Sequence, residues 1–339
     1  MSAPLLEVEN LKTHFSVAWE TFFGANRTLK AVDGISFSID KGDTFGLIGE
    51  SGCGKTTLGR TLLALEERTE GDARFEGRSI YSLSKKELRA LRREVQVIFQ
   101  DPFSSLDPRM TVRQILEEPF DIHRMLPKSA DREKEILKLI DVVGLPKAHL
   151  ERYPHQFSGG QRQRVGIARA LALKPKLIVC DEPVSALDVS IQAQILNLLQ
   201  DLQKDFDLTY LFIAHDFSVI RHLCNKVAVM YLGRVVEVAE TDALFENPQH
   251  PYTEALLSAV PVPDPRVEKK RNRILLTGDV PSPLNPPSGC HFNPRCRYVV
   301  DSCKVESPVL AETGENHHAA CPVLPFKDAP SAAALIEVA

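Results

Sequence analysis

Residues 44–57 read Thr44-Phe45-Gly46-Leu47-Ile48-Gly49-Glu50-Ser51-Gly52-Cys53-Gly54-Lys55-Thr56-Thr57. The largely apolar run before Gly49 predicts a buried strand, and the residues from Thr57 to Leu65 predict a helix. Between them lies the P-loop pattern, in which two glycines with four residues between them are followed by Lys-Thr. A strand, a glycine-rich loop and a helix in this order predict an α/β nucleotide-binding domain.

This loop is suited to phosphate because glycines let the backbone wrap closely around it, with several N–H groups pointing inward. The dipole of the following helix adds to the attraction. We expect Lys55 to hold the β- and γ-phosphates of ATP and the Thr56 hydroxyl to ligate Mg²⁺. A glycine-rich turn that matches by chance is the alternative, and the flanking strand and helix argue against it. The expected ATP-binding residues are Gly49, Ser51, Gly52, Cys53, Gly54, Lys55, Thr56 and Thr57.

Two adjacent acids, Asp181 and Glu182, follow the apolar run Leu177–Cys180, which is typical of a central parallel strand. Acids at the end of a buried strand are costly unless they serve a cation or a reaction. We expect Asp181 to hold Mg²⁺ and Glu182 to polarise the attacking water. A helix N-cap pair is the alternative reading.

The chain has 339 residues, of which 43% are hydrophobic and 25% charged, as in ordinary globular proteins. Its net charge of −4 argues against unspecific binding to nucleic acid. Acidic residues enter the N-terminal segment too early for an export signal. Because no apolar run approaches the roughly 20 residues needed to cross a bilayer, we expect any membrane role to be peripheral and to depend on partner proteins.

The remaining pattern alternates strands and helices. The segment from Thr111 to Val143 has a helical pattern, with breaks expected at Pro119 and Pro127. Gly233 lies between two apolar runs and predicts a hairpin. Further strands are expected at residues 6–11, 34–39, 95–99, 177–180 and 209–213, and an amphipathic helix at 191–204.

A second exposed, glycine-bearing helix start is predicted at Phe157-Ser158-Gly159-Gly160-Gln161, in front of a helix that runs through Leu171. Such a helix N-terminus can bind a phosphate. The P-loop already accounts for the triphosphate of this chain, so the second site requires a phosphate from elsewhere.

These residues resemble the signature motif of ABC ATPases, with Phe157 where Leu is commoner, and the resemblance covers about residues 5–256. It implies an α/β fold, namely the RecA-like P-loop NTPase core of an ABC ATPase with a helical subdomain. Other motifs of the family match at Gln100 (the Q-loop glutamine), Ser185–Asp188 (the D-loop), His215 (the switch histidine) and Phe15 (an aromatic residue that stacks on adenine).

In that family two cassettes pack head to tail, and the signature of one closes on ATP held by the P-loop of the other. The resemblance therefore implies a dimer with a second ABC ATPase subunit. It implies catalytic roles for Glu182, His215 and Gln100, with Gln100 joining Thr56 and Asp181 around Mg²⁺. The residues it assigns to ATP across the dimer are Ser158, Gly159, Gly160, Gln161 and Asp188.

A narrower resemblance is to ATP-binding subunits of dipeptide and oligopeptide permeases, most of all the second ATPase of a bacterial dipeptide permease. It is carried by residues 99–108, 152–155, 250–253 and 281–290. It implies two integral-membrane permease subunits, a periplasmic or lipid-anchored solute-binding protein and a position at the cytoplasmic face of the inner membrane. Relatives of this group also import nickel, antimicrobial peptides, opines or oligosaccharides.

Two other classes of function remain open at this point. The first is a soluble ABC ATPase acting on ribosomes or DNA, but such proteins usually carry two cassettes or long coiled-coil insertions. The second is a redox- or iron-sensing binding module with ATP as a minor ligand, against which the intact Glu182 and His215 argue.

We expect an ATPase domain over residues 5–256, with a helical subdomain at about 101–165. A C-terminal extension with four cysteines is expected over 257–325, after a charged linker at 268–273, and a flexible tail over 326–339.

Four cysteines, Cys290, Cys296, Cys303 and Cys321, are separated by five, six and seventeen residues. Irregular spacing without C-x-x-C knuckles favours an iron–sulfur cluster over zinc, and subunits that this chain resembles can carry a [4Fe–4S] cluster at these positions. Zn²⁺ with help from histidines, and unligated or disulfide-paired cysteines, are the alternatives. The histidines considered are His291, His317 and His318, and the scattered Cys53, Cys180 and Cys224 are expected to be small buried apolar groups.

Overall fold

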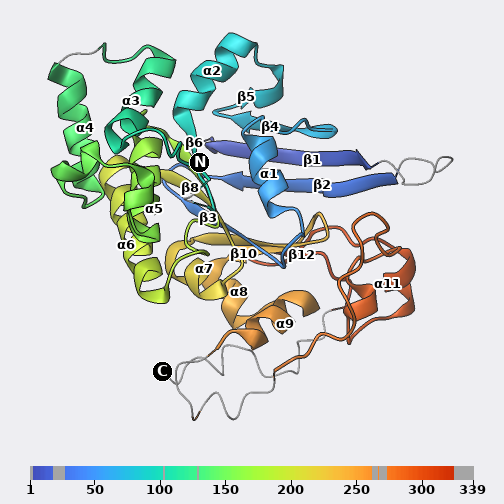
Figure 1. The fold of residues 1–339 in the computed structure, drawn as a ribbon. Coiled ribbons are helices and arrows are strands. Elements are labelled where there is room, and N and C mark those ends of the chain that lie inside the picture. Colours follow the sequence, from blue (N-terminus) through green and yellow to red (C-terminus); the bar gives the residue numbers. More distant parts are fainter. Residues whose placement is uncertain are drawn as a thin grey trace, which may run out of the picture. The chain divides into compact units, whose positions relative to one another are not determined.

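The computed structural model describes residues 3–17, 27–101, 104–127, 130–261, 266 and 273–323. The predicted tail and most of the charged linker lie outside the described residues. The chain divides into two compact units, and Figure 1 labels their helices and strands. Unit 1 comprises residues 1–39, 44–81 and 214–339, and unit 2 comprises residues 40–43 and 82–213. The domain boundaries expected from the sequence stay a prediction.

Unit 1 contains an antiparallel sheet with the strand order β2-β1-β4-β5. Its strands are β1 (Leu6–Val17), β2 (Arg27–Ile39), β4 (Glu70–Phe75) and β5 (Arg78–Ser79). Leu6, Val8 and Leu11 are buried along β1. Helix α1 (Lys55–Leu62) packs against strands β1 and β2 of this sheet (Figure 1).

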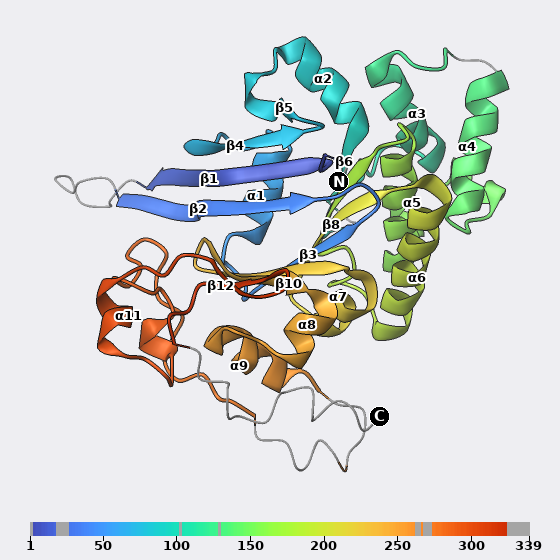
Figure 2. The same cartoon turned by 180° about the vertical axis from the view of Figure 1, so that it is seen from behind.

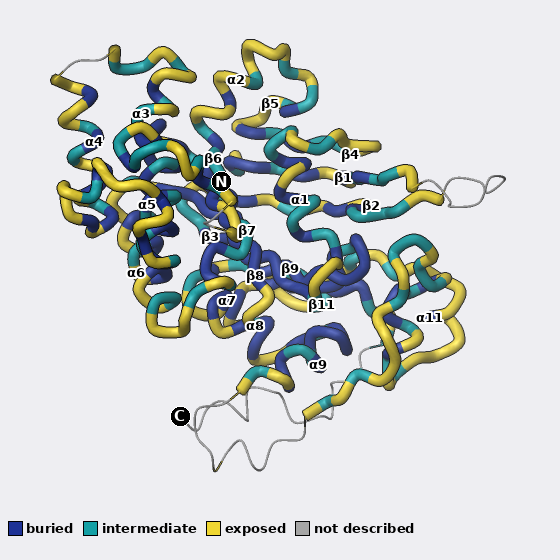
Figure 3. Tube along the Cα trace, in the orientation of Figure 1, coloured by how far each residue is buried: buried dark blue, intermediate teal, exposed yellow. Residues whose placement is uncertain are grey.

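The second group of strands in unit 1 has the order β11-β12-β10-β9-β3. They are β3 (Thr44–Ile48), β9 (Lys226–Tyr231), β10 (Arg234–Glu240), β11 (Ala311–Gly314) and β12 (His317–Ala319). β3 and β9 are parallel, whereas β10 pairs with β9 and β12 in antiparallel fashion. All five residues of β3 are buried, as the tube in Figure 3 shows. The helices that complete unit 1 are α7 (Phe217–Leu223), α8 (Thr241–Glu246), α9 (Pro251–Ala259) and α11 (Asp301–Val305).

Unit 2 is built on parallel strands in the order β8-β7-β6. They are β8 (Thr209–Ala214), β7 (Leu177–Asp181) and β6 (Val95–Ile98). Helix α5 (Gly159–Leu171) packs against β6 and against α6 (Val189–Phe206), as both views show (Figures 1 and 2). The other helices of this unit are α2 (Lys85–Glu94), α3 (Val112–His123) and α4 (Ala130–Val142).

The strands, the hairpin at Gly233 and the helices predicted from the sequence are confirmed, but the expected break at Pro119 is wrong. Helix α3 runs through Pro119 without interruption. Proline removes one backbone hydrogen bond and costs about 3 kcal/mol inside a helix. Burial of an apolar face and the capping box at Thr111 offset this cost. The buried residues of that face are Val112, Ile115, Leu116 and Phe120.

Candidate functional site

The P-loop of unit 1 curls around its own lysine. The Lys55 ammonium donates to the carbonyl oxygens of Gly49 at 2.7 Å and Glu50 at 3.2 Å. The residue is only 4% exposed. Because α1 begins at Lys55 and Gly54 is its N-cap, the helix N-terminus directly follows the loop, an arrangement that suits a phosphate.

Two glycines of the loop are required by close approaches of neighbouring backbone. A Cβ on Gly49 would lie 2.1 Å from the Met230 carbonyl oxygen, and one on Gly54 would lie 2.0 Å from that of Ala31. Gly54 also has a φ of 108°, a region that favours glycine. The motif therefore has glycine here because β2 and β9 press against the loop.

Two further contacts hold the loop in place. The Gly233 N–H donates to the Cys53 carbonyl at 2.9 Å, and the Glu50 N–H donates to the Tyr252 hydroxyl at 2.9 Å. The Cys53 thiol is buried, and desolvation raises its pKa. Cys180 and Cys224 are buried as well, so the expectation for the three scattered cysteines is confirmed.

In unit 2 the structure brings together Gln100 and Glu182, which follow β6 and β7. The Gln100 amide donates to the Glu182 carboxylate at 3.0 Å. Glu182 has a φ of 46°, a strained conformation for a residue with a side chain. Its N–H donates to the Ile213 carbonyl at 3.0 Å and its carbonyl accepts from the Ser185 hydroxyl at 3.1 Å. These bonds hold the backbone of Glu182, and the hydrogen bond from Gln100 holds its carboxylate.

The signature residues form the start of α5, as predicted. Ser158 caps the helix, and its N–H is bound by the Gln161 side chain at 3.1 Å. A Cβ on Gly160 would lie 2.4 Å from the Ile191 side chain, so the glycine lets α5 start close to α6. Ser158 is exposed, which leaves this helix N-terminus open to a ligand.

The D-loop is held by one glutamine. The Gln192 amide donates to the carbonyl oxygens of Val184 and Leu187, both at 3.0 Å. Asp188 is exposed at the N-terminus of α6 and makes no capping bond there.

The predicted ATP-site residues are divided between the two units. The P-loop and His215, which is exposed after β8, belong to unit 1. Phe15 is also in unit 1, half-buried on β1 opposite Leu29. The predicted residues in unit 2 are Gln100, Asp181, Glu182, Asp188 and the signature.

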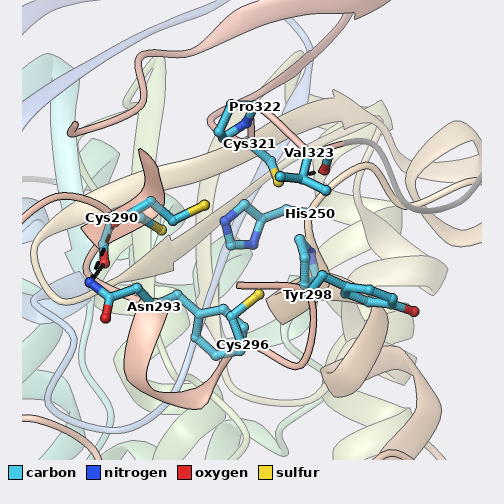
Figure 4. A pocket seen from close by; sticks show the side chains of 11 residues that line it. His250, Cys290, Asn293, Cys296, Tyr298, Cys321, Pro322 and Val323 are labelled. Carbon is cyan, nitrogen blue, oxygen red and sulfur yellow. Dashed lines mark hydrogen bonds between the residues drawn. The ribbon is translucent and has the colours of Figure 1, made fainter. Parts of the chain in front are cut away.

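The four C-terminal cysteines line one cavity in unit 1, and all four are free thiols (Figure 4). The histidines considered as zinc ligands do not line it. His317 instead binds the buried Glu237 at 2.7 Å, and His291 contacts the Leu232 carbonyl at 3.2 Å. The histidine that does line the cavity is His250, which is not among the ligands expected from the sequence.

His250 caps α9, where its Nδ1 accepts from the Tyr252 N–H at 3.1 Å. The sequence does indicate the capping role of His250, because the next residue is Pro251 and proline is common at the first position of a helix. Burial lowers the pKa of His250 to about 3, so its ring is neutral. Burial raises the pKa of the Cys290 and Cys296 thiols, and that of Cys321 to about 12.

Within the described residues, no three His, Cys, Asp or Glu side chains converge closely enough to hold a single metal ion. The same part of the chain contains no helix long and apolar enough to cross a membrane.

A P-loop beside parallel strands, together with a capped, glycine-bearing helix N-terminus, defines the class of ATP-binding cassettes. The family model described as ABC transporter matches residues 32–185, and the one described as oligopeptide/dipeptide transporter, C-terminal region, matches residues 236–303.

The chain is 53% identical to a putative oligopeptide transport ATP-binding protein, YkfD, of Bacillus subtilis, over 94% of this chain and 95% of YkfD. It is 51% identical to the oligopeptide transport ATP-binding protein AppF of the same organism, over 94% of this chain and 96% of AppF. A dimeric post-hydrolysis structure of the ATP-binding cassette MJ0796 with ADP and Pi shares 26% identity and a TM-score of 0.61, covering 70% of this chain and 98% of that one.

The chain therefore belongs to the ABC transporter family of ATP-binding proteins. It is an ATPase with the P-loop NTPase fold.

Proposed function

We propose that this chain is an ATPase subunit that powers an importer of dipeptides or oligopeptides. The observation that carries the proposal is similarity to oligopeptide transport ATP-binding proteins along 94% of the chain, including the C-terminal region that follows the ATPase core. A soluble ABC ATPase would share the core but would have no reason to share that region.

The partners follow from this role. They are a second ABC ATPase subunit, two integral-membrane permease subunits and a solute-binding protein, and the chain acts at the cytoplasmic face of the membrane. The segment after Gln100, from Asp101 to Met110, is the proposed contact with a permease. It leads from the end of β6 to α3, and Arg169 of α5 anchors it by donating to the Ser105 carbonyl at 2.6 Å.

Each site residue has a proposed role. Lys55 binds the phosphates, while Thr56, Asp181 and Gln100 are ligands of Mg²⁺. Glu182 polarises the attacking water, and its hydrogen bond to Gln100 and fixed backbone support this. The remaining roles are His215 as the sensor of the γ-phosphate, Phe15 as the adenine contact, and Ser158–Gln161 with Asp188 as the contacts across the dimer.

The function is tested by isolating the full-length chain from its native membranes. We expect two integral-membrane proteins to co-purify, and deletion of the gene to abolish uptake of labelled dipeptides or oligopeptides. Uptake defects confined to nickel, opines or oligosaccharides would assign another solute to the same ATPase. Co-purification with ribosomes or DNA alone would contradict the import role.

We further propose that Cys290, Cys296, Cys303 and Cys321 ligate a [4Fe–4S] cluster. Four thiols that are far apart in the sequence line one cavity, and four cysteine thiolates are the usual ligand set of a [4Fe–4S] cluster. Phe292, His250 and Tyr298 are among the other residues that line the cavity. When bound, the cluster would supply iron–thiolate bonds that tie this polar segment together.

If the cysteines ligate a cluster, anaerobically purified protein should show the broad absorbance at about 400 nm that iron–sulfur proteins generally have. Replacing Cys296 and Cys303 with Ser should remove the absorbance and expose residues 281–325 to protease, with basal ATPase activity at saturating MgATP largely intact. Stoichiometric zinc without iron would select the zinc alternative, and four freely alkylated thiols without metal would exclude both.

A further inference from the structure

An ion pair between Arg295 and Glu50 joins the P-loop to the segment that carries the four cysteines, residues 290–321, which we call the cysteine-bearing segment. Arg295 Nη1 donates to Glu50 Oε2 at 2.7 Å, and Nη2 donates to Oε1 at 3.1 Å. The Arg295 side chain is 7% exposed and that of Glu50 is 26% exposed. A two-point, largely buried pair of this kind fixes both position and orientation.

The surroundings make this contact rigid. Arg295 ends a short 3₁₀ helix, Asn293–Arg295, and the next residue is Cys296. Phe292, the residue before this 3₁₀ helix, packs edge-on against Tyr231 with ring centroids 5.3 Å apart, and also against Tyr252 at 5.3 Å. The Tyr252 hydroxyl in turn accepts a hydrogen bond from the Glu50 N–H. Backbone and side chain of Glu50 are thus both held by the C-terminal part of unit 1.

The charge of Glu50 requires an explanation, because a carboxylate in a phosphate-binding loop repels the ligand. Glu50 is the second residue of the loop, and its carbonyl oxygen is one of the acceptors of the Lys55 ammonium. An unpaired negative charge there would oppose the triphosphate and attract Lys55 away from it. Arg295 supplies the positive charge that cancels this effect.

We propose that Arg295, which belongs to the cysteine-bearing segment, neutralises the Glu50 carboxylate and so removes the electrostatic penalty that this carboxylate would impose on ATP at the P-loop. The inference rests on the assignment of ATP binding to residues 49–57. The ion pair is formed by side chains other than those of the cysteines, so its test uses variants that leave all four cysteines in place.

The test is equilibrium binding of MgATP to the full-length chain and its variants. Arg295→Gln should raise the Kd about tenfold, since it leaves a carboxylate beside the phosphates. Glu50→Gln should bind as tightly as the wild type or more tightly, and the double variant should return to within about threefold of wild type. Both single variants break the same pair, so a merely structural role predicts equal losses and no rescue.

Arg295→Lys covers the case in which Arg295→Gln does not fold. It keeps the charge but loses the two-point geometry, and we expect a Kd about threefold above wild type. Unchanged affinity in Arg295→Lys and Arg295→Gln, or a double variant as weak as Arg295→Gln, would overturn the proposal. Lys55→Ala serves as the reference: if it also binds MgATP normally, the P-loop assignment itself fails.

If the Arg295–Glu50 pair affects MgATP binding, MgATP binding must affect the pair equally, and this gives a second measurement besides the Kd. If the pair favours ATP binding, MgATP should strengthen the pair and slow hydrogen exchange in residues 290–305 of the wild type. Glu50→Gln should bind MgATP without this protection. Equal protection in the wild type and Glu50→Gln would show that the segment does not respond through Arg295.

Discussion

Glu182 combines two properties that a structural residue rarely has, namely a left-handed backbone and a carboxylate bound by Gln100. We predict that Glu182→Gln keeps ATP binding but lowers turnover at least about 100-fold, the usual scale for loss of a general base. The amide preserves shape and can still accept from Gln100. Steady-state phosphate release and MgATP affinity measure the two effects, and near-normal turnover would remove Glu182 from its proposed role.

At the scale of single residues, the sequence predicts what local backbone patterns specify. The P-loop, the acidic pair and the capped signature helix are all read from contiguous residues. The ion pair of Arg295 and Glu50 joins residues 245 positions apart, so no local sequence pattern predicts it. His250 was missed for the same reason, because only the folded chain brings it to the cysteines.

The two groups of strands in unit 1 are joined by a buried acid on β2. The Asp33 carboxylate accepts two hydrogen bonds from the Arg234 guanidinium, at 2.8 and 3.1 Å, and contacts the His14 ring at 3.1 Å. The Asp33 backbone N–H donates to the Gly233 carbonyl at 2.8 Å. Burial acts to raise the pKa of Asp33, but the hydrogen bond and charge of Arg234 outweigh it and lower the pKa.

Because the folded pKa lies below the unfolded one, the contribution of Asp33 is present above about pH 4 and is lost as the pH falls through the folded pKa. We predict that Asp33→Asn costs about 1–2 kcal/mol of unfolding free energy at pH 7. The difference from wild type should shrink towards pH 3 in urea titrations. A difference that is constant with pH would contradict this origin.

Elements were predicted well where apolar periodicity is strong, as in β3, β7 and β8. Pro119 shows the limit of such reasoning. A proline predicts a break from local chemistry alone, whereas tertiary burial of the α3 face decides whether the helix continues.

At the scale of the whole molecule, the exposed cap Ser158 leads to a prediction about assembly. Ser158→Arg in a Glu182→Gln chain should leave MgATP binding to that chain's P-loop intact but prevent the ATP-closed dimer, because a long cation would occupy the expected phosphate position. Sedimentation with the partner ATPase, or of the chain alone, measures closure. Ser158→Ala, which loses the cap without adding bulk, should still close; a closed dimer with Ser158→Arg would refute the trans-signature contact.

The P-loop NTPase fold could be predicted from the sequence because it is built from strand–loop–helix repeats. The organisation of the C-terminal segment could not. Its cavity depends on turns such as that at Gly289, where a Cβ would lie 2.4 Å from the Cys303 carbonyl oxygen. Such turns leave no periodic signal in the sequence.

The pairing of β12 with β10 has a practical consequence for anyone who shortens this chain. The Ala320 N–H donates to the Val236 carbonyl at 2.8 Å, and β12 occupies the hydrogen-bonding side of β10. Removing residues 311–323 would expose an apolar strand edge, which invites pairing with other copies and aggregation. A chain truncated before Cys290 also loses β12 and should therefore form soluble aggregates in light scattering, whereas cysteine-to-serine variants of the full chain should not.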